Sequence, residues 1–184
     1  MNPFETPWKT LTQEIKYKND WMQVREDKVI RPDGLEGIYG VIETRIATGV
    51  LALTPDNRVY LVGQYRYTTD NYSWEIIEGG SDPGENAMET AKRELQEEAG
   101  LIAHSWEPLG HEIHLSNCIS SERGFLFIAR DLEETEATPE GSEVLQIKTV
   151  SIPEAMEMVL AGEIQDAMTI IGLNLIDRKL NTRS

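Results

Sequence analysis

Residues 79–101, GGSDPGENAMETAKRELQEEAGL, constrain the fold of this chain more than any other stretch, because they encode one helix with clear ends. Asn86 is a favourable N-cap residue, and Glu89, three positions later, completes the pattern of a capping box. At the other end, Gly100 followed by an apolar residue is typical of a left-handed stop. The segment therefore predicts a helix over residues 87–99.

This helix carries an unusual cluster of charge. Its apolar stripe at helical spacing is Met88, Ala91, Leu95 and Ala99, and its charged residues on another face are Arg93, Glu94, Glu97 and Glu98. Like charges on adjacent turns cost about 0.2–0.5 kcal/mol per pair, and a helix C-terminus disfavours anions. A solvated acidic face and a ligand-binding cluster are both consistent with this pattern.

The loop before the helix favours a ligand-binding cluster. Gly79, Gly80, Pro83 and Gly84 allow tight turns and close backbone approach, and Glu85 stands where the loop meets the helix. Several carboxylates beside a loop carbonyl form an oxygen-rich site that suits Mg²⁺ or Mn²⁺, which also take substrate phosphates as ligands. The sequence thus predicts a site for a divalent metal and a phosphate group.

The spacing of this segment resembles the Nudix box of the Nudix hydrolases. The matching string is Gly79-x5-Glu85-x7-Arg93-Glu94-Leu95-x-Glu97-Glu98-x-Gly100-Leu101. The resemblance implies an α/β/α sandwich around a mixed sheet and Mg²⁺-dependent hydrolysis of a nucleoside diphosphate linked to another group, with Mn²⁺ as a substitute. It also implies roles for the acidic residues: Glu94, Glu98, Glu97 and the Glu78 carbonyl as metal ligands, Arg93 as the residue that orients them, and Glu85 as support.

The composition of the chain argues against some classes of binding partner. A formal net charge of −15 argues against nucleic acid or an anionic membrane surface, since both would be repelled. Cys118 is the only cysteine, so an intrachain disulfide is impossible and a reducing compartment is expected. The N-terminal ten residues resemble no signal peptide, and no apolar run reaches the length of a membrane span. We expect a cytoplasmic enzyme.

Hydrophobic patterning and turn residues predict strands and helices along most of the chain. Residues 21–30 and 37–46 form a predicted antiparallel hairpin, joined through the turn sequence RPDG. Further strands are expected at 50–54 and 58–67, paired with each other, and at 74–77, 106–115, 124–130 and 144–150. Residues 131–143 read as an exposed acidic loop, followed by helices over 153–160 and 163–180. This mixed order indicates an α/β fold.

Features outside the box resemble one branch of the family, the ADP-ribose pyrophosphatases and nucleoside diphosphate sugar hydrolases. They are the run Gln64-Tyr65-Arg66, the pair Trp74-Glu75, the run at 120–123, the N-terminal hairpin and the pattern at 162–167. The resemblance implies a substrate-binding set of Arg66, Glu75, Gly79, Gly80 and Glu122. Residues 116–118 are Ser-Asn-Cys where ADP-ribose pyrophosphatases usually carry Pro-Gly. Nucleoside diphosphate sugars as a class, including ADP-ribose and GDP-mannose, are therefore favoured over ADP-ribose alone.

Two questions stay open at this stage. The catalytic base is Glu97 in the box, or Glu143 or Glu140 in the acidic loop. A hydrolase of nucleoside triphosphates or dinucleoside polyphosphates is the nearer alternative function. A non-catalytic nucleotide-sensing module is the more distant one, because such modules usually lose box glutamates that are all present here.

The N-terminal hairpin predicts a homodimer. An isolated hairpin is only marginally stable in water, so its apolar residues need a surface to cover them. That surface is either the chain's own sandwich or a second copy of the chain, and the resemblance to this branch favours the second copy. Residues 1–46 are therefore expected to form an arm and a dimerising hairpin that completes the partner's substrate site, and residues 47–184 the hydrolase domain.

Overall fold

The computed structural model describes residues 4–138 and 144–182. The chain divides into two compact units. Unit 1 combines Met1–Arg45 with His114–Arg123, and unit 2 combines Ile46–Ile113 with Gly124–Ser184. The inclusion of residues 114–123 in unit 1 was not expected from the sequence.

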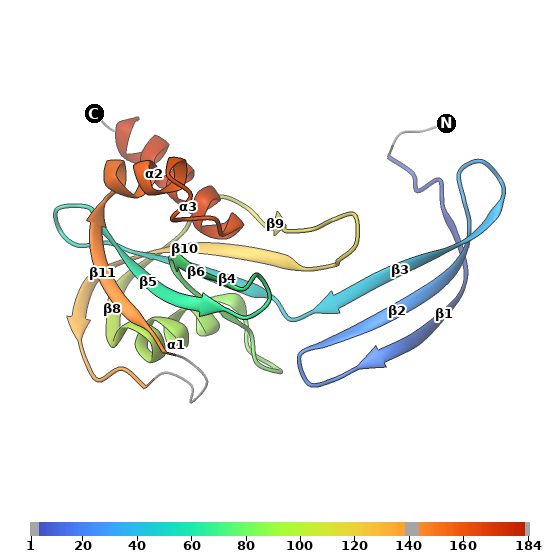
Figure 1. Cartoon of the computed structure of the whole chain (residues 1–184), viewed down its shortest axis with the longest axis horizontal. Coiled ribbons are helices and arrows are strands. Elements are labelled where there is room, and N and C mark those ends of the chain that lie inside the picture. The colour runs from blue at the N-terminus through green and yellow to red at the C-terminus, as the bar shows by residue number, and fades with distance from the viewer. Residues whose placement is uncertain (1–3, 139–143, 183–184) are drawn as a thin grey trace. The chain divides into compact units, whose positions relative to one another are not determined.

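Unit 1 is built on a three-stranded antiparallel sheet in the order β1-β2-β3 (Figure 1). Its strands are β1 (Lys9–Lys18), β2 (Met22–Ile30) and β3 (Glu36–Thr44). The β2–β3 pair confirms the predicted hairpin, and Gly34 with φ of 84° supplies the left-handed turn residue. Strand β1 was missed. Backbone hydrogen bonds of 2.9 Å from Ile42 N to Ile119 O and from Ser121 N to Ile42 O tie the 114–123 segment to β3.

The sheet of unit 1 buries little apolar surface. Val29 is the one hydrophobic residue of this unit that is buried among the residues described, and all ten residues of β1 are exposed. Asp27 is also buried, where Arg25 Nε at 2.8 Å and Gln13 Nε2 at 3.1 Å donate to its carboxylate. The described residues of unit 1 include no helix. Hydrogen bonds rather than a core therefore hold this sheet together.

Unit 2 contains two sheets. The first is mixed and runs β7-β4-β10-β8, with the short β9 also paired to β10; its strands are β4 (Ala47–Ala52), β7 (Ile77–Gly80), β8 (Leu101–Pro108), β9 (Ile113–His114) and β10 (Arg123–Glu134). The pair β4–β10 is parallel. The second sheet is antiparallel and runs β11-β5-β6, from β5 (Arg58–Arg66), β6 (Asn71–Glu75) and β11 (Gln146–Ser151).

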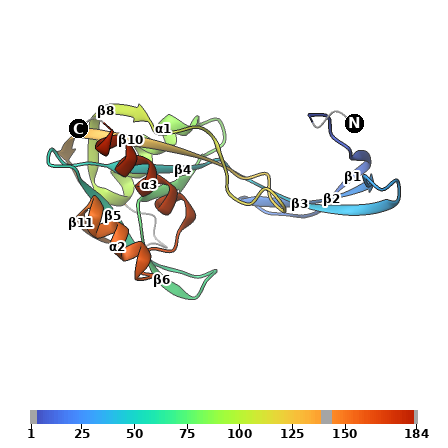
Figure 2. The same ribbon diagram turned by 90° about the horizontal axis from the view of Figure 1, so that it is seen from above.

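Helices cover both faces of the mixed sheet, as Figures 1 and 2 show. They are α1 (Ala87–Ala99), α2 (Ile152–Leu160) and α3 (Ala167–Asn181). Helix α1 packs against β4, β7 and β8, where Leu95 joins Val50 and Ile77 in one buried cluster. Helix α3 packs on β4, and Gly49 makes this possible, because a Cβ there would lie 3.1 Å from Met168 Cε. The predicted α/β/α fold is confirmed.

Helix α1 has the predicted bounds and caps. The Asn86 side chain accepts from Met88 N and Glu89 N, the Glu89 carboxylate accepts from Asn86 N, and Gly100 is left-handed. Every helix in the described part of the chain falls short of the length and apolar character that spanning a membrane requires.

Four expectations about unit 2 were wrong. Strands β4 and β5 share only one bridge, Leu53–Val59, because β4 pairs with β7 and β10 instead. Strand β8 begins at Leu101, directly after the helix stop, rather than at residue 106. Strand β10 continues to Glu134, so the acidic stretch begins as a strand. Helix α3 begins at Ala167, where Asp166 caps it, rather than at residue 163.

Candidate active site

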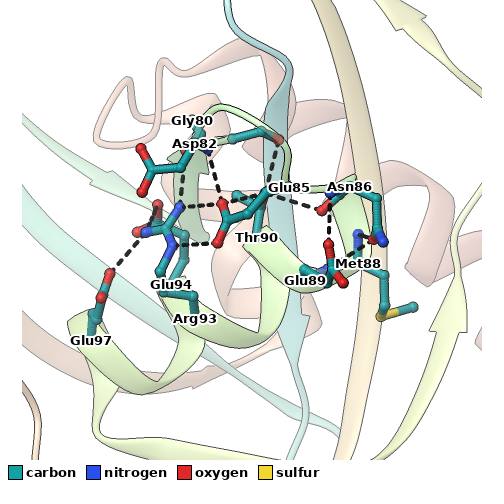
Figure 3. Close-up of polar contacts among 11 residues, drawn as sticks. Gly80, Asp82, Glu85, Asn86, Met88, Glu89, Thr90, Arg93, Glu94 and Glu97 are labelled. Atoms are coloured by element: carbon teal, nitrogen blue, oxygen red, sulfur yellow. Dashed lines mark hydrogen bonds and ion pairs between the residues drawn. The ribbon is translucent and has the colours of Figure 1, made fainter.

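The glycine-rich loop and helix α1 are joined by an ion pair between Glu85 and Arg93 (Figure 3). Arg93 Nε and Nη2 donate to the two Glu85 oxygens at 2.9 and 3.0 Å, and Asp82 N and Thr90 Oγ1 donate to the same carboxylate. The guanidinium and these hydrogen bonds hold the pKa of Glu85 at about 2. Glu85 is therefore ionised across the neutral range and fixes one edge of Arg93.

Arg93 also reaches the other acids of the helix. Its Nη1 donates to Glu94 Oε1 at 2.8 Å and to Glu97 Oε2 at 2.9 Å, while Nη2 donates to Gly80 O at 3.0 Å. Figure 3 shows the guanidinium surrounded by these groups. The Glu85 carboxylate, followed by Glu97 and Glu94, raises the pKa of Arg93. One cation thus offsets the repulsion among three carboxylates and holds them beside the loop.

The Glu94 side chain occupies the space that a side chain at residue 79 would take. A Cβ on residue 79 would lie 1.8 Å from Glu94 Oε1 and 1.9 Å from its carboxyl carbon, so no larger residue fits without moving that side chain. The Glu94 side chain is only 12% exposed. The absence of a side chain at residue 79 is what allows the Glu94 carboxylate to lie against β7.

Glu98 is buried rather than displayed on the exposed face that the sequence predicted. It is 3% exposed, and Glu78 N donates to its Oε2 at 3.2 Å. The reason is that α1 packs against β7, so the helix face between its apolar stripe and Glu94 meets the strand rather than solvent. Glu98 is thereby held against the backbone of Glu78.

The side chain of Glu78 enters a second buried network. Thr169 Oγ1 in α3 donates to Glu78 Oε1 at 3.0 Å and accepts from Ile76 N at 3.0 Å. Burial raises the pKa of the Glu78 carboxyl well above its ordinary value, and the neighbouring Asp166 and Glu75 carboxylates add to the effect. The sequence had indicated only the carbonyl of Glu78. A sequence signal for this contact exists, because Asp166 followed by Thr169 is the pattern of a capped helix start. It indicates that a helix begins here, but not that the helix packs beside Glu78.

Arg66 and Glu75 form a partly buried ion pair on neighbouring strands. Arg66 Nε donates to both Glu75 oxygens at 3.1 and 3.0 Å, and Nη2 makes a further contact with Oε2. Glu75 is 3% exposed, whereas the Arg66 side chain is 40% exposed. Burial opposes the charge of Arg66, but Glu75, together with Glu78 and Glu98, raises its pKa. Arg66 therefore lies close enough to Glu75, Glu78 and Glu98 for their negative charges to stabilise its positive charge.

The donor atoms of this region suit a hard divalent cation. The carboxylates of Glu94, Glu97 and Glu98 and nearby loop carbonyls are all oxygen donors, which is the ligand type that Mg²⁺ and Mn²⁺ prefer. Within residues 4–138 and 144–182, no three acidic, histidine or cysteine side chains are yet gathered in a metal-binding arrangement. Arg93 pairs with Glu94 and Glu97 in this structure. The oxygen donors of these residues are of the type that a hard divalent cation binds.

One predicted site residue belongs to the other unit of the chain, and both alternative bases of the acidic stretch are outside the described residues. Glu122 belongs to unit 1, where its backbone N–H donates to Ser120 Oγ at 2.9 Å. Glu143 and Glu140, the alternative bases, lie outside the described residues. The remaining predicted residues, from Arg66 and Glu75 through the box, all belong to unit 2.

Comparison with known families divides the chain in a similar way. Residues 43–169 match the NUDIX domain, and residues 8–42 match the nucleoside diphosphate sugar hydrolase N-terminal domain. The chain is 31% identical to the ADP-ribose pyrophosphatase of Mycobacterium tuberculosis over 173 residues, which cover 92% of this chain and 83% of that protein.

Other similar proteins match along nearly the whole chain. The methanol dehydrogenase activator of Bacillus methanolicus is 26% identical over 170 residues, with 91% of each chain covered. The crystal structure of an ADP compounds hydrolase superimposes with a TM-score of 0.84, 21% identity and 96% of each chain covered. The structural likeness supports the same fold over both units.

Proposed function

This chain belongs to the Nudix family of hydrolases, and we propose that it hydrolyses the diphosphate bond of nucleoside diphosphate sugars, with ADP-ribose and GDP-mannose as the first substrates to test. The observation that carries the proposal is the set of box carboxylates around Arg93 in a chain that also has the N-terminal domain of nucleoside diphosphate sugar hydrolases. The products would be a nucleoside monophosphate and a sugar phosphate.

The chain's own residues supply the binding and positioning for this reaction. Glu94, Glu97, Glu98 and the Glu78 carbonyl would hold Mg²⁺, or Mn²⁺ in its place. When bound, the metal neutralises the diphosphate and makes a water more acidic. Gly79 and Gly80 let the loop backbone approach the substrate closely, and the Arg66 guanidinium can bind a diphosphate oxygen through two N–H groups. Arg93 holds the carboxylates in place.

The base that accepts the proton from the attacking water is Glu97, or one of the two acids between β10 and β11, Glu140 and Glu143. Glu97 is 31% exposed, so its carboxylate is accessible to water as well as to Arg93. Comparing Glu97→Gln with Glu143→Gln and Glu140→Gln identifies the base: its loss lowers kcat more than it raises KM.

A panel of nucleotides tests the function. The chain is incubated with Mg²⁺ and ADP-ribose, GDP-mannose, ATP or a diadenosine polyphosphate, and the monophosphate released is measured. We expect the nucleoside diphosphate sugars to give the highest kcat/KM. A preference for the triphosphate or the dinucleotide would assign the chain to another Nudix substrate class, and no turnover with any of them would favour a sensing role.

We further propose that the chain is a homodimer joined through unit 1. The sheet of this unit leaves large apolar side chains in water, among them Trp21 at 69%, Ile38 at 68% and Leu35 at 60% exposure. Exposed apolar residues at this density mark a surface that another protein covers. A symmetric pair would bury the same surface twice. Light scattering is expected to give twice the chain mass of 20.8 kDa; a value at that mass would contradict the dimer.

A further inference from the structure

A polar cavity of about 340 Å³ lies in unit 2 between the β5–β6 turn and the start of α3. Its wall includes Arg66, Asn71, Ser73, Glu75, Gln165 and Asp166. The two sides of the cavity are linked by a hydrogen bond of 3.0 Å from Asn71 Nδ2 to Gln165 Oε1, between residues 94 positions apart in sequence. The volume is at the lower end of the range for small-ligand sites.

The chemistry of the wall matches a sugar better than a base. Amides, hydroxyls and carboxylates supply both donors and acceptors, and each hydroxyl of a sugar needs one of each. Nucleobases are commonly held by stacking on aromatic rings, and none of the residues that line this cavity is aromatic. The only cationic group in the wall, Arg66, is already paired with the buried Glu75. A bare polyphosphate would therefore meet little uncompensated positive charge deep in the cavity.

The position of the cavity relates it to the candidate active site. Arg66 lines the cavity and interacts electrostatically with Glu78 and Glu98. Asp166 also lines the cavity and interacts with the Glu78 carboxyl. A diphosphate held by Arg66 next to the box carboxylates would thus have one of its two substituents at the mouth of this cavity. Of the two substituents, the sugar fits the polar, non-aromatic lining of the cavity better than the nucleoside does.

We propose that this cavity binds the sugar of the sugar phosphate half of the substrate, and that Asn71 and Gln165 determine which sugar is accepted. The proposal rests on the proposed function of the adjoining site. The two amides lie on separate elements, a strand and the loop before α3, and their hydrogen bond fixes them as one pair in the wall, which presents its remaining donors and acceptors to the sugar. Ribose and hexose differ in size and in the positions of their hydroxyls, which a paired donor and acceptor can distinguish.

Single and double variants at these positions test the proposal. Asn71→Ala, Gln165→Ala and the double variant are compared with Asn181→Ala, which removes an exposed amide that donates to Asp177 Oδ1 at 3.0 Å in α3. For ADP-ribose hydrolysis, we expect KM to rise about three- to tenfold per lost contact with less change in kcat. The ratio of kcat/KM for ADP-ribose over GDP-mannose should change in the same variants, and the control should leave it unaltered.

A binding measurement separates this cavity from the catalytic proposal. Calorimetry with ribose 5-phosphate should show weaker binding to the Asn71 and Gln165 variants, whereas inhibition by AMP should stay at its wild-type strength. Weaker AMP inhibition with unchanged ribose 5-phosphate binding would place the nucleoside half in the cavity and overturn the proposal, as would variants that behave like Asn181→Ala. If the wild-type chain hydrolysed no nucleotide sugar, the proposed function would fail. The calorimetry with ribose 5-phosphate would still show whether the cavity binds a sugar phosphate.

Discussion

The two units of this chain are stabilised in different ways. In unit 2, strands β4 and β5 carry runs of fully buried residues such as Val50 and Leu61, and helices α1 and α3 pack on β4. In unit 1, three strands of nine or ten residues bury Val29 and leave most apolar side chains in water. Sheets without a covered apolar face are marginal on their own. The difference shows that unit 2 has its own core, and it is the reason for our proposal that unit 1 associates with a second chain.

The two units also treat charge differently. The ion pair Lys16–Glu14 of unit 1 has side chains that are 42% and 66% exposed, and pairs of this kind contribute little to stability. In unit 2, Glu98 and Glu75 are each 3% exposed. Burying acids is costly unless they are paired or hydrogen-bonded. Unit 1 also buries an acid, Asp27, but that carboxylate pairs with Arg25 of the same strand. Glu98 belongs to the box helix, which is why we propose a chemical role for it.

The largest expected effect in this comparison is on activity. Glu98→Gln should lower kcat/KM for ADP-ribose by about 100-fold or more, because we propose Glu98 as a metal ligand and such ligands contribute several kcal/mol to the transition state. Glu26→Gln in β2 of unit 1 is the control and should change kcat/KM less than about twofold. Steady-state kinetics with saturating Mg²⁺ measures both. If Glu98→Gln kept the wild-type kcat/KM, Glu98 would not be a ligand to the catalytic metal.

A pair of truncations sharpens the difference in packing. Leu95→Ala in α1 should lower the free energy of unfolding by about 2–5 kcal/mol, because Leu95 is 0% exposed and its loss leaves a cavity. Ile15→Ala in β1, where Ile15 is 46% exposed, should change it by less than about 0.5 kcal/mol at protein concentrations too low for association. Urea unfolding at two protein concentrations measures both. Equal losses would show that unit 1 has a core of its own.

Local signals explain why parts of the fold could be predicted. Helix α1 was predicted to the residue because Asn86, Glu89 and Gly100 act on their immediate neighbours. The β2–β3 hairpin was predicted because its turn contains a proline and a glycine that close it. The box acids were recognised from their spacing on one helix. Each of these features depends on residues a few positions apart.

Long-range contacts explain what was missed. The turn at residues 55–57 suggested that its flanking strands pair, yet β4 pairs with β10, more than 70 residues later, and no local pattern encodes that choice. Strand β1 was missed because its sequence, KTLTQEIKYK, has only three large apolar residues among ten, which is a weak strand signal. The burial of Glu98 and the approach of Thr169 to Glu78 depend on how α1 and α3 pack on the sheet.

Thr169 provides a prediction of intermediate size. Thr169→Val keeps the shape but removes the hydroxyl that joins Ile76 N to Glu78, so the strand that carries the Glu78 carbonyl loses its anchor. We expect kcat to fall about tenfold or more and half-maximal activity to need more Mg²⁺, as for other residues that orient metal ligands. Thr169→Ser should restore both values. In unit 1, Thr44→Val is the control, because the Thr44 hydroxyl only bonds to the exposed carbonyl of Arg45. Unchanged Mg²⁺ dependence in Thr169→Val would reduce Thr169 to a packing role.

The smallest expected effect is on acid stability. Arg93 lowers the pKa of Glu85 from 4.5 to about 2 in the folded protein, so the ionised form stabilises unit 2 fully above pH 4.5, and this contribution is lost as the pH falls toward 2. Glu85→Gln should therefore cost about 1 kcal/mol at pH 6 and progressively less below pH 4.5, a magnitude reduced by the partial exposure of the pair. In unit 1, Lys16 lowers the pKa of Glu14 as well, but water surrounds that pair, so Glu14→Gln should alter the same profile less. Urea unfolding of the three proteins between pH 3 and 6 measures the difference, and a larger effect at Glu14 would show that the exposed pairs of unit 1 stabilise the chain more than the shielded pair of the box.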